Sequence, residues 1–173
     1  TIEKLSKQWQ TKHASWDELL ECTKAPEQKY AKSDLVDFYV TTAETYFKTI
    51  REAIKEVAPN QLYLGCRFAG VNETAALAAA KYCDVVSYNI YDYDVSMWEI
   101  GEGVDKPVII GEFHFGAHDR GMNDEGLKFA ENQDERARCY VSYIKSALGN
   151  PLFVGAHWFQ YRDEMVTGRF DGE

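Results

Sequence analysis

The stretch PVIIGEF, residues 107–113, places three aliphatic side chains and a glycine directly before a glutamate. Three other stretches have the same form, a short apolar run with a polar or aromatic end: LYLGCRF at 62–68, DVVSYNIY at 84–91 and LFVGAHWF at 152–159. Apolar runs without regular polar alternation are typical of strands that helices cover in a parallel sheet. The sequence therefore predicts four parallel strands.

The segments around these runs have apolar residues at helical spacing. We expect helices over 3–22 (with a short continuation), 33–58, 73–81 and 133–148, a brief helix or turn over 95–103, and loops over 23–32, 114–132 and 160–173. Ser33 or Asp34 is the expected N-cap of the long helix, and Asn72 that of the Ala-rich helix. Helix then strand, four times over, makes an α/β chain equivalent to half of a (β/α)8 TIM barrel, which usually takes about 250 residues.

The composition limits the classes of partner. The 173 residues include 28 Asp and Glu against 19 Lys and Arg, which gives a formal charge of −9. Such a chain repels the phosphate backbone, so we expect no nucleic-acid partner. No stretch approaches the roughly 18 uncharged apolar residues of a membrane helix, so we expect no membrane partner. With 45% hydrophobic residues, the chain can form one folded domain.

Cysteine and histidine spacing gives no sign of a metal site. The cysteines at 22, 66, 83 and 139 are not at zinc-ligand spacing, and we expect buried free thiols. His114 and His118 are four residues apart, but Gly116 between them argues against a helical metal pair. No phosphate-binding or dinucleotide motif is present. We therefore expect neither a metal nor a cofactor.

The end of each predicted strand carries side chains that can bind or react. They are Arg67 on the first strand, Tyr88, Asn89 and Tyr91 on the second, Glu112 and His114 on the third, and His157, Trp158 and Gln160 on the fourth. In a parallel barrel these ends face one mouth, where active sites are built. The alternative is that they are ordinary solvated loop residues.

Glu112 is the strongest catalytic candidate, because it emerges from an almost entirely apolar strand. An unpaired buried carboxylate costs on the order of several kcal/mol, so such a group is either paired or reactive. A purely structural ion pair with Arg67 or Arg120 is the alternative. The pair Asn72-Glu73 could also be catalytic, but its position before an Ala-rich helix favours an N-cap with an acidic first turn.

The longer strings at the strand ends resemble those of glycoside hydrolase family 50, the β-agarases. The string PVIIGEFHFGA at 107–117, with DRGM at 119–122, resembles the seventh-strand region of that family. The string VGAHWFQYRD at 154–163, with TGRFDGE at 167–173, resembles the eighth. YLGCRFA at 63–69 and CDVVSYN at 83–89 are similar to strands five and six. The similarity covers nearly all of residues 60–173 and is weaker before residue 60.

The resemblance implies a retaining glycosidase in which Glu112 is the nucleophile and Tyr91, or else Tyr88, orients it. It also implies that Trp158 is a platform for a sugar ring. Further sugar contacts are implied for the other strand-end residues: Arg67, Tyr88, Asn89, His114 and Gln160. In this family the general acid/base ends strand four, for which this chain has no match. The expected bond is a β-galactosidic bond of a polysaccharide, with agarose, other galactans and β-galactosides all open.

The resemblance further implies that residues 1–173 are the C-terminal half of a TIM-barrel catalytic domain, strands five to eight, with the N-terminal half and the final helix absent. Exposed strand edges would then pair with the missing half or with a second copy in a homo-oligomer. The piece by itself would be inactive, and a protein of this family would be secreted or periplasmic. Two non-catalytic alternatives stay open, a carbohydrate-binding half barrel and a structural half barrel that dimerises.

Overall fold

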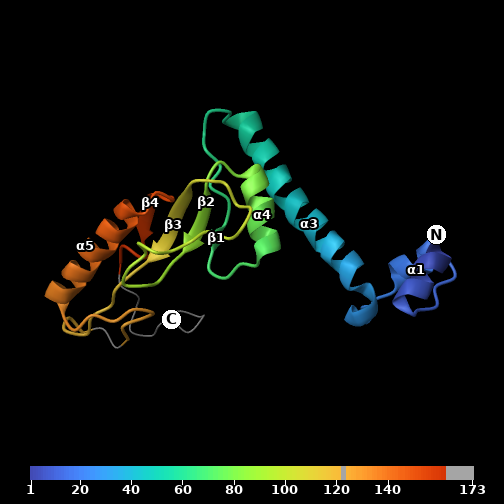
Figure 1. Cartoon of the computed structure of the whole chain (residues 1–173), viewed down its shortest axis with the longest axis horizontal. Helices are drawn as coiled ribbons and strands as arrows, with labels where there is room; N and C mark the ends of the chain where they lie inside the picture. The colour runs from blue at the N-terminus through green and yellow to red at the C-terminus, as the bar shows by residue number, and fades with distance from the viewer. Residues whose placement is uncertain (122–123, 163–173) are drawn as a thin grey trace.

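The computed structural model describes residues 1–121 and 124–162. Its strands form one sheet of four in the order β1-β2-β3-β4, and every neighbouring pair is parallel (Figure 1). The strands are β1 Arg67–Phe68, β2 Val86–Asn89, β3 Val108–Phe113 and β4 Phe153–Trp158. The prediction of parallel strands alternating with helices is confirmed. The expected loop over 163–173, with its string TGRFDGE, and Met122 of DRGM lie outside the described residues.

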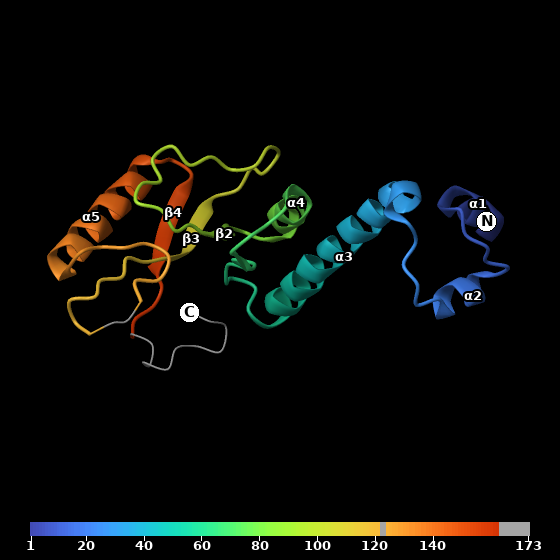
Figure 2. The same ribbon diagram turned by 90° about the horizontal axis from the view of Figure 1, so that it is seen from below.

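The helices lie to either side of this sheet. They are α1 Ile2–Trp9, α2 Trp16–Glu21, α3 Gln28–Val57, α4 Glu73–Tyr82 and α5 Gln133–Gly149. Figures 1 and 2 show α5 beside β4, and α4 between the sheet and the carboxyl-terminal half of α3. Helices α1 and α2 lie at the opposite end of α3, away from the sheet (Figure 2). The sheet, α4, α5 and the end of α3 therefore form the body that positions the strand ends.

The start of α3 differs from the prediction. The helix begins at Gln28, after Glu27, so the expected N-cap at Ser33 or Asp34 is wrong. Residues 28–32, QKYAK, contain no glycine or proline and continue the helix without a break. The Asp34 carboxylate instead accepts a hydrogen bond from the Trp9 indole Nε1 at 2.7 Å. It therefore ties α1 to α3 and does not cap a helix.

The expected helix over 3–22 is divided in two. Gln10 adopts a left-handed conformation, with φ of 53°, and ends α1. Ser15 then begins α2, and its hydroxyl accepts a hydrogen bond from the Glu18 backbone N–H at 3.1 Å. Residues 95–103 contain turns, as one of the two expected alternatives.

One face of the sheet carries a continuous aromatic core. The Phe113 ring of β3 stacks on Tyr143 of α5 with centroids 4.3 Å apart, and both rings are buried. Further aromatic contacts extend this core across the sheet through Trp98 to Phe68 and Phe47. Burial raises the pKa of the Tyr143 hydroxyl, which donates to the Ile90 carbonyl at 2.7 Å. These contacts fix β3 against α5.

A charged cluster closes the amino-terminal edge of the sheet. The Asp84 carboxylate accepts a hydrogen bond from the Tyr63 backbone N–H at 2.8 Å and pairs with Arg51 at 2.9 Å and Lys55 at 3.2 Å. The Tyr63 bond first, then the two cations, lower the pKa of Asp84 to about 2. The expected strand over 62–68 shortens to the two residues Arg67–Phe68, and Gly65 before them has φ of +67°, which is not a strand conformation.

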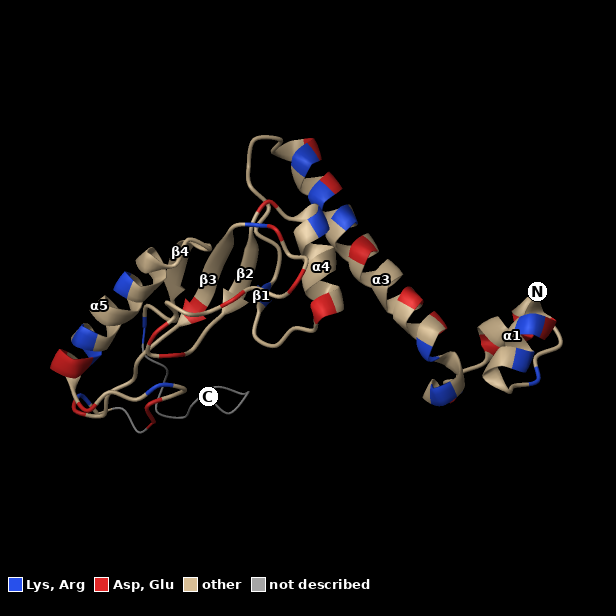
Figure 3. Cartoon of the chain, in the orientation of Figure 1, with Lys and Arg blue, Asp and Glu red and all other residues tan. Residues whose placement is uncertain are grey.

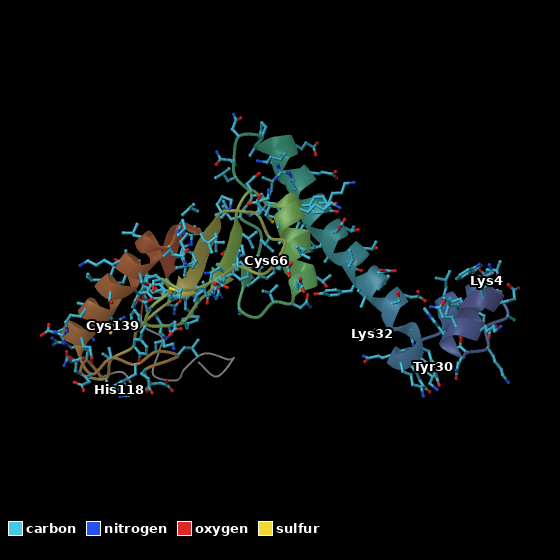
Figure 4. The ribbon with its side chains drawn as sticks, viewed as in Figure 1. Lys4, Tyr30, Lys32, Cys66, His118 and Cys139 are labelled. Atoms are coloured by element: carbon cyan, nitrogen blue, oxygen red, sulfur yellow. The ribbon has the colours of Figure 1, made fainter. Side chains whose placement is uncertain are left out.

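Charges of both signs are interspersed along the helices, as Figure 3 shows for α3 and α5. No helix among the described residues is long and apolar enough to cross a membrane. All four cysteines are free thiols, and Figure 4 places Cys66 at the sheet and Cys139 on α5. Burial raises the pKa of the Cys83 thiol to about 12, whereas Cys22 is exposed, so the expectation of uniformly buried cysteines is wrong.

Candidate functional site

An irregularity in β3 sets the direction of Glu112. Ile110 pairs with Tyr88 of β2, but the next β2 residue, Asn89, pairs with Glu112, so Gly111 is one residue extra. The pairing of β3 with β4 shifts in the same segment. A bulge of this kind re-aims the side chains next to it. The acidic residue of β3, red in Figure 3, lies near the carboxyl end of the strand, close to the loops that follow the strands.

Each carboxylate oxygen of Glu112 has a partner from a neighbouring strand. The Tyr91 hydroxyl donates a hydrogen bond to Oε2 at 2.8 Å. The Arg67 Nη1 lies 3.3 Å from Oε1. The Glu112 side chain is 16% exposed and that of Arg67 is 52% exposed, so the carboxylate is held in one orientation below a solvated guanidinium. A carboxylate fixed in this way can attack an electrophilic carbon or accept a proton.

The absence of a side chain at Gly111 lets three neighbouring side chains come close beside this carboxylate. A Cβ atom at Gly111 would lie 2.6 Å from Ser87 Oγ, 2.8 Å from Asn89 Oδ1 and 3.0 Å from Arg67 Cγ. Real Cβ atoms do not come this close to other side chains, so these positions require a glycine. The arrangement brings Asn89 and Arg67 together beside Glu112.

Asn89 carries a buried acceptor that the described residues leave unsatisfied. Its Oδ1 atom is inaccessible to solvent and has no hydrogen-bond partner among the residues that the structure describes. A buried acceptor without a donor costs about 1–3 kcal/mol. A hydroxyl group that reaches this position would remove that cost.

His114 is held on both ring nitrogens by backbone groups. The Leu127 backbone N–H donates to Nε2 at 2.9 Å, and Nδ1 lies 3.2 Å from the Phe159 carbonyl oxygen. Its ring also meets the Tyr91 ring edge-on, with centroids 4.9 Å apart. The structure therefore places His114 beside the Tyr91–Glu112 pair and fastens it to two other segments.

Two of the predicted site residues lie elsewhere. The Tyr88 ring packs between Phe68 and Trp98, with centroids 5.8 Å and 5.2 Å away, and burial raises its pKa. Trp158 packs against Phe113, at 5.4 Å, and under the Arg136 guanidinium, at 5.2 Å. Successive strand residues point to opposite faces, so both side chains belong to the helix-covered face.

Phe159 is a site residue that the sequence reasoning missed. The Arg67 guanidinium carbon lies 5.9 Å from the centre of its ring. Its backbone N–H donates to the Phe113 carbonyl at 2.9 Å, which extends the β3–β4 pairing by one step. The signal was available in the sequence, since alternation along β4 puts residue 159 on the face opposite Trp158. The predicted Gln160 follows it, and its carbonyl accepts from the Trp158 Nε1 at 2.9 Å.

Other candidates have local structural partners. The Asn72 side chain accepts a hydrogen bond from the Ala75 backbone N–H at 2.9 Å, which confirms the N-cap prediction for α4. His118 lies in the loop that precedes α5 (Figure 4) and pairs with Glu125 at 3.1 Å. Among residues 1–121 and 124–162, no group of three or more His, Cys, Asp or Glu side chains could hold a metal ion.

Comparison with known proteins gives consistent relatives over the whole chain, although no protein-family model matches it. β-Agarase B of Vibrio sp. (strain JT0107) is 44% identical over 180 residues, which cover 99% of this chain and 19% of that protein. β-Agarase A of the same strain is 43% identical over 187 residues, which cover 99% of this chain and 18% of that protein. The chain thus spans about a fifth of the length of these curated relatives.

Solved structures give the same picture. The crystal structure of the agarase AgWH50C superimposes with a TM-score of 0.86 at 44% identity, over 99% of this chain and 25% of that one. An exo-β-agarase gives 0.85 at 42% identity, over 100% and 24% of the two chains. PfGH50B gives 0.84 at 39% identity, over 99% and 25%. The resemblance read from the strand-end strings is therefore confirmed.

Proposed function

Since this chain is homologous along its length to one segment of the family 50 β-agarases, we propose that it is the nucleophile-bearing part of a retaining glycoside hydrolase that acts on agarose. The observation that carries the proposal is the Glu112 carboxylate, bonded to Tyr91 at 2.8 Å and to Arg67 at 3.3 Å at the strand ends. Sites in parallel α/β folds are built at this end.

The proposed reaction has two steps. A Glu112 oxygen forms a bond to the anomeric carbon of a galactose unit as the glycosidic C–O bond breaks, and a separate carboxylic acid protonates the departing oxygen. Water then attacks the same carbon, gives its proton to that second carboxylate and releases Glu112. Retaining enzymes hold the two carboxyl groups about 5–5.5 Å apart. Our proposal takes the second carboxyl from outside these 173 residues.

The partners of Glu112 suit a nucleophile. Arg67 stabilises the negative charge before attack, and the Tyr91 hydroxyl fixes the lone pairs of Oε2 in one direction. When the glycosyl bond forms, the carboxylate loses its charge and both contacts weaken. As the intermediate breaks down, the carboxylate regains its negative charge and both contacts strengthen again. The same two contacts therefore favour departure of Glu112 as a leaving group.

The sugar contacts we propose are revised by the geometry. Asn89 Oδ1 would accept a hydroxyl hydrogen from the sugar, because it has no donor among the described residues. Phe159, with its ring toward Arg67, replaces Trp158 as the apolar platform. Arg67 and Gln160 are further contacts. A neutral sugar suits such a site, because apolar faces and a few hydrogen bonds suffice to orient it.

We also propose that the four strands are strands five to eight of a TIM barrel and that residues 1–173 contribute its C-terminal half. Within the described residues β1 and β4 each pair on one side only, and a free parallel edge favours pairing with further strands. The rest of the barrel, or a second copy, would supply those strands and the acid. On this proposal the 173 residues alone hydrolyse no agarose.

The test is Glu112→Gln in the full-length protein, with release of reducing ends from agarose as the measurement. Turnover should fall by at least about 10³-fold, because the amide is a poor nucleophile. Binding of agaro-oligosaccharides, measured by calorimetry, should persist. Glu52→Gln on the surface of α3 is the matched control, since Glu52 only faces Lys48 at 3.9 Å, and it should keep full turnover. Full turnover by Glu112→Gln would overturn the nucleophile assignment, and sugar binding without any turnover by the parent protein would favour the carbohydrate-binding alternative.

A further inference from the structure

His114 connects three segments at the rim of the site through its two ring nitrogens. Given the proposed function, on which this inference rests, we propose that His114 is a neutral positioning residue that holds Tyr91 and the end of β4 around Glu112, and that it does not contact the sugar.

The bonds to the ring define its protonation. The Leu127 backbone N–H can only donate, so Nε2, 2.9 Å away, must accept and carries no proton. The proton of the neutral ring is then on Nδ1, which donates to the Phe159 carbonyl at 3.2 Å. Both polar atoms of the side chain are thus engaged by the protein's own backbone, and neither points at a ligand.

The loop before α5 is shaped around this ring. Gly126 has φ of +66°, and a Cβ atom there would lie 2.5 Å from His114 Nε2. Gly116 has a similar constraint, since its Cβ would lie 2.0 Å from the Glu125 carbonyl oxygen. Backbone bonds between residues 116 and 128–130 then close the loop. Two glycines therefore let residues 125–127 pass directly over His114.

The ring contacts one partner of Glu112 directly and is linked to the other through Phe159. Its contact with the Tyr91 ring, at 4.9 Å, limits where the Tyr91 hydroxyl can point, and that hydroxyl is bonded to Glu112. Its bond to the Phe159 carbonyl fixes the residue whose ring faces Arg67. His114 therefore acts on both contacts of the Glu112 carboxylate without touching it.

Protonation of His114 would break the arrangement, because Nε2–H would then face the Leu127 N–H. The charged and titratable groups of the elements packed around the ring are Glu112 on β3, Arg67 on β1, Tyr91 and Asp92 after β2, and His118, Glu125 and Lys128 in the loop. Loss of the Nε2 acceptor on protonation should therefore release the Leu127 backbone N–H.

The experiment compares His114→Ala, His114→Asn and His114→Gln in the full-length protein. Asn can replace the Nδ1 donor and Gln the Nε2 acceptor, whereas Ala replaces neither. His118→Gln, in the same loop, is the matched control, because His118 contacts Glu125 and the Phe129 ring but neither Tyr91 nor Phe159 among the described residues. Three readouts are needed: kcat and KM on agarose fragments, oligosaccharide affinity in the Glu112→Gln background, and hydrogen exchange of the peptide that contains Leu127.

We expect His114→Ala to lower kcat about 100-fold, since misplacement of catalytic groups by about 1 Å has that effect, with sugar affinity changed less than about threefold. The Asn and Gln variants should recover part of kcat, and only Gln should restore protection of Leu127. Exchange at Leu127 should rise in acid in the parent protein but not in His114→Gln.

Weaker sugar binding with kcat unchanged would make His114 a sugar contact and overturn the proposal, as would variants that change nothing. If His114→Ala does not fold, the Asn and Gln variants decide the question by the same readouts. If Glu112→Gln keeps full turnover, the proposed function fails separately, and the exchange of Leu127 still decides whether His114 holds the loop.

Discussion

The amino-terminal and carboxyl-terminal ends of the strands form two edges of the sheet, and each holds one carboxylate next to an arginine. The two carboxylates have different surroundings. Asp84, at the amino-terminal edge, has a backbone donor and two cations, which lower its pKa to about 2. Glu112, at the carboxyl edge, has a hydroxyl and one half-exposed guanidinium. Their side chains are similarly buried, at 22% and 16% exposed. Exposure alone therefore does not distinguish a structural carboxylate from a reactive one.

The surroundings make the difference. Asp84 joins α3 to Tyr63, and among the described residues its carboxylate contacts the Tyr63 backbone N–H, Arg51 and Lys55, which it holds in place. Glu112 adjoins Gly111 and lies near Asn89, whose Oδ1 is unsatisfied among the described residues. The Asp84 carboxylate is thus fully engaged in stabilising the fold, whereas a buried acceptor beside Glu112 lacks a donor among the described residues.

Apart from Glu112→Gln, the largest effect is expected for Gly111→Ala, which would disrupt the site at the carboxyl ends of the strands. Its Cβ would push against Ser87, Asn89 and Arg67 at 2.6–3.0 Å, so Arg67 must move away from Glu112. We expect turnover on agarose to fall about 100-fold, with a stability loss of about 1–3 kcal/mol from overpacking. Kinetics and urea unfolding measure the two effects.

Gly155→Ala on β4 is the control for that change. A Cβ there would lie 3.4 Å from Ile109 Cδ1, which is close to ordinary contact. Both activity and stability should stay near those of the parent protein. Equal effects of the two glycine substitutions would show that the close packing of Ser87, Asn89 and Arg67 around Gly111 has no special role.

Asp84→Asn should damage the other edge without touching the chemistry. Because the folded pKa of about 2 lies below the ordinary value of 3.8, the carboxylate stabilises the fold above about pH 4, and this stabilisation is lost as the pH falls toward 2. Allowing for solvent access, we expect a loss of about 1–2 kcal/mol at pH 7. The variant should unfold earlier in urea at pH 7 but lose less stability than the parent between pH 4 and 2.

Turnover at a temperature where Asp84→Asn remains folded should match the parent protein. A large loss of turnover would show that the two edges are coupled, contrary to the comparison. Equal acid sensitivity of variant and parent would show that another carboxylate governs unfolding in acid.

Asn72→Ala should have the smallest effect. It compares a helix cap with the Glu112 site at the same end of the strands. Asn72 follows β1 and caps α4 through its bond to the Ala75 N–H, and its Nδ2 donates to the Tyr39 hydroxyl of α3 at 3.1 Å. We expect a stability loss of about 1 kcal/mol and turnover within about twofold of the parent. Thermal unfolding and agarose hydrolysis measure both. A loss of turnover comparable to that of Glu112→Gln would restore the Asn72-Glu73 pair as a catalytic candidate.

The elements that were predicted correctly have local signals. Helix α5 follows an Asn cap, and β3 is an uninterrupted apolar run, so neither depends on distant residues. The cap at Asn72 was equally local. Two errors concern element ends: residues 28–32 contain no helix breaker and extend α3 upstream of Ser33, and Gly65, with φ of +67°, interrupts the run over 62–68. Contacts such as Trp9 with Asp34 and Tyr63 with Asp84 join residues 20 or more positions apart, so no local pattern predicts them.

The sequence by itself determined which strand ends carry chemistry, because apolar stems and polar tips follow each other along the chain. It also determined Glu112 as the leading carboxylate and, through its strings, the relationship to the β-agarases. Only the tertiary structure decided which neighbours face that carboxylate. The extra residue at Gly111 sets the direction of Glu112. Alternation along β4 and β2 places Phe159 on the same face as Glu112, and Trp158 and Tyr88 on the helix-covered face. Side-chain direction depends on register between strands, and register is set by contacts across the sheet.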